Sequence, residues 1–182
     1  NGHVTEQAEL PDHLPEDGYW WVTLARREFE VLQANVQATL QTLCDTRLVD
    51  LHISDLLNNQ LPSHHDFTSL YDVLVFRRLA TSQTETDLAH PGQPLHEVKH
   101  NSVPKVFRRI NTSPVGFAVF DRLLLSIHPT DCAVRDAYAE RLLASTTAGA
   151  RNGLGRMPTS PADLMLRVVN HMVDSYLELR RE

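Results

Sequence analysis

The stretch from Val115 to Pro129, VGFAVFDRLLLSIHP, decides the fold of this chain. Two apolar runs, Val115 to Phe120 and Leu123 to His128, flank the polar pair Asp121-Arg122. Short apolar runs of this length are typical of buried strands, and the polar link between them indicates a tight connection. We therefore expect a β-hairpin over this stretch.

Two further strands are expected earlier in the chain. The segment Tyr19 to Leu24 (YWWVTL) is aromatic and β-branched, and Pro15 and Gly18 precede it. The segment Tyr71 to Leu79 (YDVLVFRRL) is again apolar and rich in residues that favour strands. Both are predicted to be strands, the first of them buried.

Four helices are expected, over Ala25 to Cys44, Leu51 to Asn59, Asp131 to Ala144, and Ser160 onward to the end of the chain. In the first, apolar residues recur every three or four positions, as in an amphipathic helix. These are Phe29, Leu32, Val36, Leu40 and Leu43. The last has a strong start signal, because Ser160-Pro161-Ala162-Asp163 combines an N-cap, a first-turn proline and an acid. No Gly or Pro ends it.

The order of these elements predicts a single α/β or α+β domain over residues 1–182, with a mixed sheet covered by helices on both faces. Single domains most often have roughly 100 to 200 residues. The polar segment Thr81 to Ser102 has no sustained apolar period and is expected to be a long exposed loop.

Composition excludes several classes of function. The formal net charge of -6 argues against nucleic-acid binding, which depends on dense Lys and Arg, and an acidic surface favours cations instead. The longest apolar runs are far shorter than the roughly 18 residues of a membrane-spanning helix. We see no secretory signal, and Asn1 is not a natural start. Cys44 and Cys132 are too few for a disulfide framework and are expected to be reduced.

One short motif favours an enzyme. His96, Glu97 and His100 satisfy H-E-x-x-H, the zinc peptidase signature in which two histidines bind zinc and the glutamate acts as base. That chemistry needs a rigid helix, whereas Pro94 and Pro104 flank this segment within a polar stretch. Candidates for a third ligand are His128, Asp131 and Glu140. We regard zinc peptidase activity as an alternative and expect no enzyme.

Two other polar clusters have plainer interpretations. His64, His65 and Asp66 are consecutive potential ligands, but adjacent side chains diverge and Pro62-Ser63 indicates a turn, so a solvated turn is expected there rather than a metal site. The pairs Arg77-Arg78 and Arg108-Arg109 are expected to face solvent or to pair with acids.

Three segments, in order, resemble the cytoplasmic amino-terminal domain of the CorA family of divalent-cation transporters. The first is similar to that family's short acidic helix and following strand, the second to its hairpin, and the third to the helix whose Val-Asp-x-Tyr leads into the stalk. They are Leu51 to Phe76 (LHISDLLNNQLPSHHDFTSLYDVLVF), Val115 to Pro129, and Ser160 to Arg180 (SPADLMLRVVNHMVDSYLELR). On this resemblance the stalk helix begins near 175–182.

The resemblance implies the cytoplasmic side of an inner-membrane protein that is a homopentamer at full length. Its partners would be its own stalk and transmembrane helices and divalent cations, Mg²⁺ or Co²⁺, with no cofactor required. The family's Gly-Met-Asn pore signature is absent from this sequence, so transport itself does not reside in these residues. We expect the isolated domain to associate weakly at most.

The resemblance also points to one metal-site residue. Asp55 matches the helix acid that contributes to the family's regulatory site between subunits, where metal binding holds the pore closed. Two further acidic positions of the family are Ser54 and Asn170 here. Because Mg²⁺ prefers hard oxygen ligands, this loss should weaken or move the site, and the ten histidines leave room for Zn²⁺, Co²⁺ or Ni²⁺. A metal-independent interaction domain is the third alternative.

Overall fold

The computed structural model describes residues 3–79, 112–130, 132–147 and 157–179. The strands are β1 (Trp20–Ala25), β2 (His64–Phe67), β3 (Asp72–Leu79), β4 (Thr112–Val119) and β5 (Leu123–His128). The helices are α1 (Arg26–Cys44), α2 (Asp50–Leu57), α4 (Ala133–Thr147) and α5 (Pro161–Leu179). The expected hairpin, strands and helices are thus confirmed, with bounds that differ by a few residues at most. The first strand is not buried as expected, because β1 lies at an edge of the sheet and only its last residue, Ala25, is buried.

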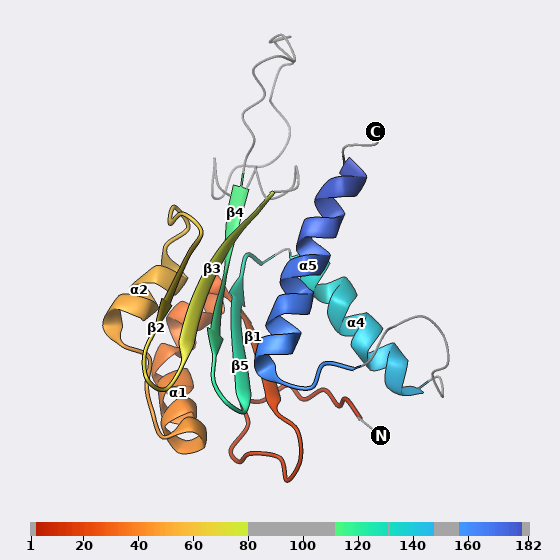
Figure 1. Ribbon diagram of the computed structural model, residues 1–182. Helices are drawn as coiled ribbons and strands as arrows, with labels where there is room; N and C mark the ends of the chain where they lie inside the picture. The colour runs from red at the N-terminus through yellow and green to blue at the C-terminus, as the bar shows by residue number, and fades with distance from the viewer. Residues whose placement is uncertain (1–2, 80–111, 131, 148–156, 180–182) are drawn as a thin grey trace.

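The strands form one mixed five-stranded sheet in the order β1-β5-β4-β3-β2. The pair β1 and β5 is parallel, and the other three pairs are antiparallel. Figure 1 shows α1 and α2 on one face of this sheet and α4 and α5 on the other. The predicted α/β fold with helices on both faces is therefore confirmed.

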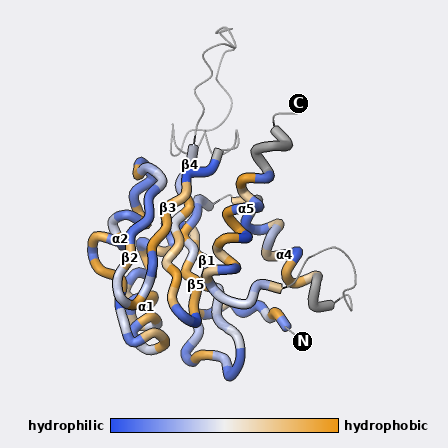
Figure 2. The backbone as a smooth tube through the Cα atoms, in the orientation of Figure 1, coloured by the Kyte–Doolittle hydropathy of each residue, from blue (hydrophilic) through white to orange (hydrophobic). Residues whose placement is uncertain are grey.

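The hairpin β4–β5 lies in the middle of the sheet and joins two hydrophobic cores. All six residues of β5 are buried, as expected for a strand covered on both faces. Leu123 and Leu125 belong to the core under α1 and α2, whereas Leu124 packs against α5. Figure 2 shows hydrophobic residues concentrated along the central strands and on α5. Because both faces of β5 are buried, its sequence is a nearly continuous apolar run rather than an alternation of apolar and polar residues.

Helix α2 lies close to the sheet because β4 carries a glycine beneath it. A Cβ atom added to Gly116 would lie 2.4 Å from Cδ2 of Leu56, a side chain that is itself buried. Only a residue without a side chain permits this approach. The glycine therefore fixes the depth at which α2 sits, and with it the position of every polar residue that α2 presents to β2.

The start of α5 follows the sequence signal closely. The Asp163 N–H donates to Ser160 Oγ at 3.1 Å, and the Thr159 N–H donates to the Asp163 carboxylate at 3.0 Å. The first bond satisfies an amide that the first helical turn leaves without a partner, and the second ties the residue before the N-cap to the helix. Of the helices that the structure describes, none has the length and apolarity needed to cross a bilayer.

One sequence interpretation is wrong, and one alternative of another is excluded. His64, His65 and Asp66 form most of strand β2 rather than a turn, because they pair with β3 from His64↔Val75 to Phe67↔Asp72. Arg78 was expected to face solvent or to pair with an acid; it is only 2% exposed, which excludes the first alternative. Its neighbour Arg77 donates to the backbone carbonyls of Asn59, Leu61 and Thr112 and so ties the loop after α2 to the sheet.

The loop expected at 81–102 and the second arginine pair at 108–109 lie outside the described residues.

Candidate functional site

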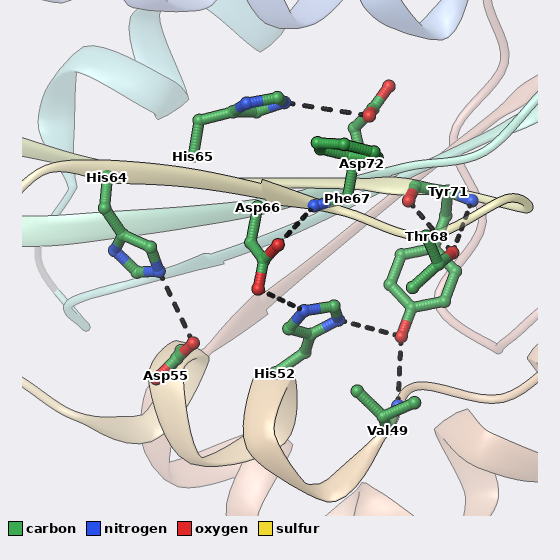
Figure 3. A network of polar contacts seen from close by, with 10 residues as sticks. All are labelled: Val49, His52, Asp55, His64, His65, Asp66, Phe67, Thr68, Tyr71 and Asp72. Carbon is green, nitrogen blue, oxygen red and sulfur yellow. Dashed lines mark hydrogen bonds and ion pairs between the residues drawn. The ribbon is translucent and has the colours of Figure 1, made fainter.

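Three pairs of histidine and aspartate gather at the edge of the sheet formed by β2 (Figure 3). Strand β2 alternates, so that His64 and Asp66 face α2 while His65 and Phe67 face the other side. On α2, His52 and Asp55 are three positions apart and lie on the face that meets β2. Two pairs therefore connect α2 with β2, and the third lies on the opposite face of the sheet.

Asp55, the residue singled out from the sequence, lies in the last turn of α2. Its Oδ2 atom is 3.4 Å from Nε2 of His64, and its side chain is only 15% exposed. The His64 side chain is 30% exposed, so the pair is half covered and open to solvent on one side. Asp55 is thus held against β2 of its own chain rather than extended into solvent.

The second pair belongs to a closed hydrogen-bond network. The Val49 N–H donates to Tyr71 Oη at 3.0 Å, so the Tyr71 hydroxyl is free to donate to Nδ1 of His52 at 2.9 Å. Nε2–H of His52 then donates to Asp66 Oδ2 at 3.2 Å. Every polar group of the buried His52 and Tyr71 rings has a partner, which gives this network a structural role.

Asp66 is held as an anion by this arrangement. The Phe67 N–H donates to Asp66 Oδ1 at 2.8 Å, and this bond, followed by the one from His52, lowers the pKa of the carboxyl. Strand β2 is at the edge of the sheet, where unpaired N–H groups can pair with a strand of another chain. The bond to Asp66 satisfies the Phe67 N–H within the domain.

The third pair is exposed. Nε2 of His65 is 3.6 Å from Asp72 Oδ1, with side chains 56% and 59% exposed. The His65 ring stacks on the ring of Phe67, and the two ring centroids are 6.1 Å apart. The Phe67 side chain is itself exposed to solvent. Solvent screens such a pair, and it is expected to contribute little to stability.

His128, proposed from the sequence as a third zinc ligand, is buried and fully engaged. Its Nδ1 donates to the Pro129 carbonyl at 2.8 Å, and its Nε2 accepts from Thr23 Oγ1 at 2.9 Å and from Arg135 Nη1 at 3.0 Å. Burial lowers the pKa of His128 to about 4, and the Arg135 charge acts in the same direction. The ring is therefore neutral and has no free lone pair for a metal.

The remaining candidates are scattered. Ser54 on α2, Asn170 on α5 and Glu140 on α4 are all exposed. The peptidase motif His96, Glu97 and His100, together with Asp131, lies outside the described residues. Among the residues that are described, no group of three or more His, Cys, Asp or Glu side chains is arranged to hold a metal ion.

Both cysteines are free thiols, as expected. Burial raises the pKa of Cys44 to about 11 and also raises that of Cys132. Neither thiol is an activated nucleophile.

Sequence reasoning missed His52 and Tyr71 and misjudged His64. His52 lies four positions before Leu56, so the two residues share the buried face of α2. From the sequence, this spacing indicated only that position 52 belongs to the core. The sequence of His64 to Phe67 (HHDF) has no apolar alternation that would indicate a strand, and the neighbouring Pro62 favoured a turn.

Comparisons with known proteins support the fold alone. No protein-family profile matches the chain, and no curated protein sequence matches it. Solved structures do match: the full-length CmaX protein (14% identity, TM-score 0.56) and the ZntB cytoplasmic domain from Vibrio parahaemolyticus RIMD 2210633 (13%, 0.56). A third is the CorA magnesium transporter from Methanocaldococcus jannaschii (13%, 0.52).

These matches cover 94%, 96% and 91% of this chain but only 40%, 56% and 42% of the other chains. The chain thus spans about half the length of the structures that it resembles. As the sequence resemblance predicted, it has the fold of the ZntB cytoplasmic domain and of a part of the CorA magnesium transporter.

Proposed function

We propose that this chain is the cytoplasmic, metal-sensing part of a CorA-type divalent-cation transporter. The observation that carries the proposal is the fold match, which includes nearly all of this chain and about half of three larger proteins. The three sequence segments that resemble the family fall on α2 to β3, on the β4–β5 hairpin and on α5. The fold match covers at least 91% of the chain that carries these segments.

In this proposal the complete protein is a homopentamer in the inner membrane, and its cytoplasmic domains hold the pore closed when intracellular metal is abundant. Asp55 is the residue that meets the cation. One carboxylate binds Mg²⁺ weakly, because the ion gives up its water shell reluctantly and needs several oxygen ligands. Ser54 and Asn170 add no charge, so a neighbouring subunit would have to supply further oxygens.

The first test is the reading frame beyond Glu182. The proposal requires two hydrophobic helices downstream, the first ending in Gly-Met-Asn or a close variant. A stop codon directly after Glu182 would remove the proposal.

The second test addresses regulation in the full-length protein. Millimolar Mg²⁺ is expected to protect the native protein from limited proteolysis and to protect the Asp55→Ala variant less. Asp72→Ala is the matched control, because Asp72 is also paired with a histidine but is exposed on the other face. Equal protection of all three proteins would show that Asp55 is not a sensing residue.

We propose no enzymatic activity. Among the described residues, no three His, Cys, Asp or Glu side chains are grouped so as to hold the metal ion that a zinc peptidase needs. The lone pair of His128 is occupied, which removes one of the three candidates for a third zinc ligand. Zinc-dependent peptide cleavage that is abolished by Glu97→Gln would contradict this conclusion.

A further inference from the structure

His64 lies between two hydrogen-bond acceptors. Its Nδ1 atom is 3.3 Å from the Pro62 carbonyl oxygen, and its Nε2 atom is 3.4 Å from Asp55 Oδ2. A neutral imidazole has a single N–H, so it can donate to one of these oxygens only. The other ring nitrogen then has no proton to share with the oxygen that lies 3.3 or 3.4 Å from it. A positive charge placed on or beside the ring would remove this conflict.

Two kinds of positive charge can do so. A second ring proton makes His64 a donor to both oxygens, and the result is an ordinary ion pair with Asp55. Alternatively, Nδ1–H donates to Pro62 and a metal ion lies between Nε2 and Asp55. In metal sites, the ligating histidine commonly donates its other N–H to a backbone carbonyl or a carboxylate, which fixes the ring orientation.

The distance across the pair suits a metal ion. Two ligand atoms that are each about 2.1 Å from a tetrahedral ion lie about 3.4 Å apart. Nε2 of His64 and Oδ2 of Asp55 are 3.4 Å apart. An ion could therefore bind with little movement of either side chain. With the two side chains 30% and 15% exposed, water can reach the site and complete the coordination.

The other two histidine–aspartate pairs lack these features. The two nitrogens of His52 already have complementary partners in Tyr71 and Asp66, so no cation is needed there. His65 and Asp72 are both more than half exposed, and water can satisfy them. Among the three pairs at the β2 edge, the conflict between acceptors is thus specific to His64.

We propose that His64 and Asp55 form a binding site for one divalent transition-metal ion of the Zn²⁺, Co²⁺ or Ni²⁺ type. A mixed imidazole and carboxylate pair suits these ions better than it suits Mg²⁺. The described residues bring no third protein ligand to the pair, so water completes the coordination and the affinity is modest. The inference extends the proposed role of Asp55 but is argued from this chain's own contacts, without a neighbouring subunit.

The test is Zn²⁺ titration of the 182-residue chain by calorimetry, with the visible absorption of bound Co²⁺ as a second readout. His96→Ala and His100→Ala are introduced in every protein, so that the H-E-x-x-H segment does not contribute. We expect one site whose affinity falls by roughly tenfold or more in His64→Ala and in Asp55→Asn. His65→Ala is the matched control, since it removes an exposed histidine from the same strand, and its affinity should be unchanged.

Thermal unfolding in the absence of metal checks that the variants remain folded. If His64→Ala does not fold, His64→Gln replaces it in the titration. Absence of binding by the parent chain at millimolar Zn²⁺ would leave only the protonated ion pair and overturn the proposal. An equal loss in His65→Ala would also overturn it, because the binding would then be unspecific. The transporter assignment does not depend on this result, since the reading frame and Mg²⁺ protection test it separately.

Discussion

Acidification should destabilise this fold through His128, by an amount that the structure allows us to estimate. The side chain is 2% exposed, and burial lowers its pKa from 6.5 to about 4. Between these two values the unfolded chain binds a proton that the folded chain does not, so the free energy of unfolding falls as the pH falls. Each unit of pKa difference corresponds to about 1.4 kcal/mol.

Lowering the pH from about 7.5 to about 5 should therefore remove about 2 kcal/mol through this one residue. The hydrogen bond to the Pro129 carbonyl and the negative charges of Asp136 and Glu28 oppose the shift, because they favour the protonated ring, but burial dominates. The full contribution of about 3 kcal/mol is lost only well below pH 4, where both states are protonated. The chain should be most stable above pH 6.5.

The assay is urea unfolding at a series of pH values, for the parent chain and for His128→Gln. Glutamine can still accept from Thr23 and Arg135 but does not titrate, so its unfolding free energy should fall about 2 kcal/mol less between pH 7.5 and 5. His65→Gln, which changes an exposed histidine, should behave like the parent. An identical pH dependence for the parent and His128→Gln would refute the conclusion that His128 is buried as a neutral ring.

Three further changes test the packing around the site. Tyr71→Phe leaves the Val49 amide and His52 Nδ1 without their shared partner. The free energy of unfolding in urea should fall by about 1–3 kcal/mol, whereas no change would mean that water replaces the hydroxyl. Gly116→Ala should lower the free energy of unfolding by about 1–3 kcal/mol, and by less when it is introduced into the Leu56→Ala variant. If the effects of the two substitutions simply add, the close contact between Gly116 and Leu56 is contradicted. Cys44, whose pKa is raised to about 11, should be alkylated at pH 8 about 100-fold more slowly in the folded than in the unfolded chain, as measured by mass spectrometry. Equal rates would contradict its burial.

Local patterns were sufficient to predict the elements of this fold. The β4–β5 hairpin, β1, β3 and the four helices all follow from runs or spacings of apolar residues within a few positions of each other. The start of α5 was predicted because its cap uses neighbouring residues, Ser160 and Asp163. Strand β2 was missed because it is short and polar, and its pairing with β3 rather than its own sequence makes it a strand.

Asp55 was placed by resemblance on a short acidic helix, and the structure confirms the helix while adding a partner that the sequence did not indicate. Similarly, Arg78 was expected to face solvent or to pair with an acid, because charged residues usually are exposed. Its burial depends on tertiary packing and could not be predicted from the sequence of β3.

The sequence by itself determined the strands and helices other than β2, because secondary structure depends largely on side chains that are close along the chain. The tertiary structure decided the rest. The parallel neighbour of β1 is β5, about a hundred residues later in the chain, and His64 meets Asp55 only because α2 packs across the edge of the sheet. Such contacts require distant segments to be fixed in space at a cost in chain entropy that burial of the core offsets. Their partners are therefore set by the packing of the whole domain rather than by the residues beside them.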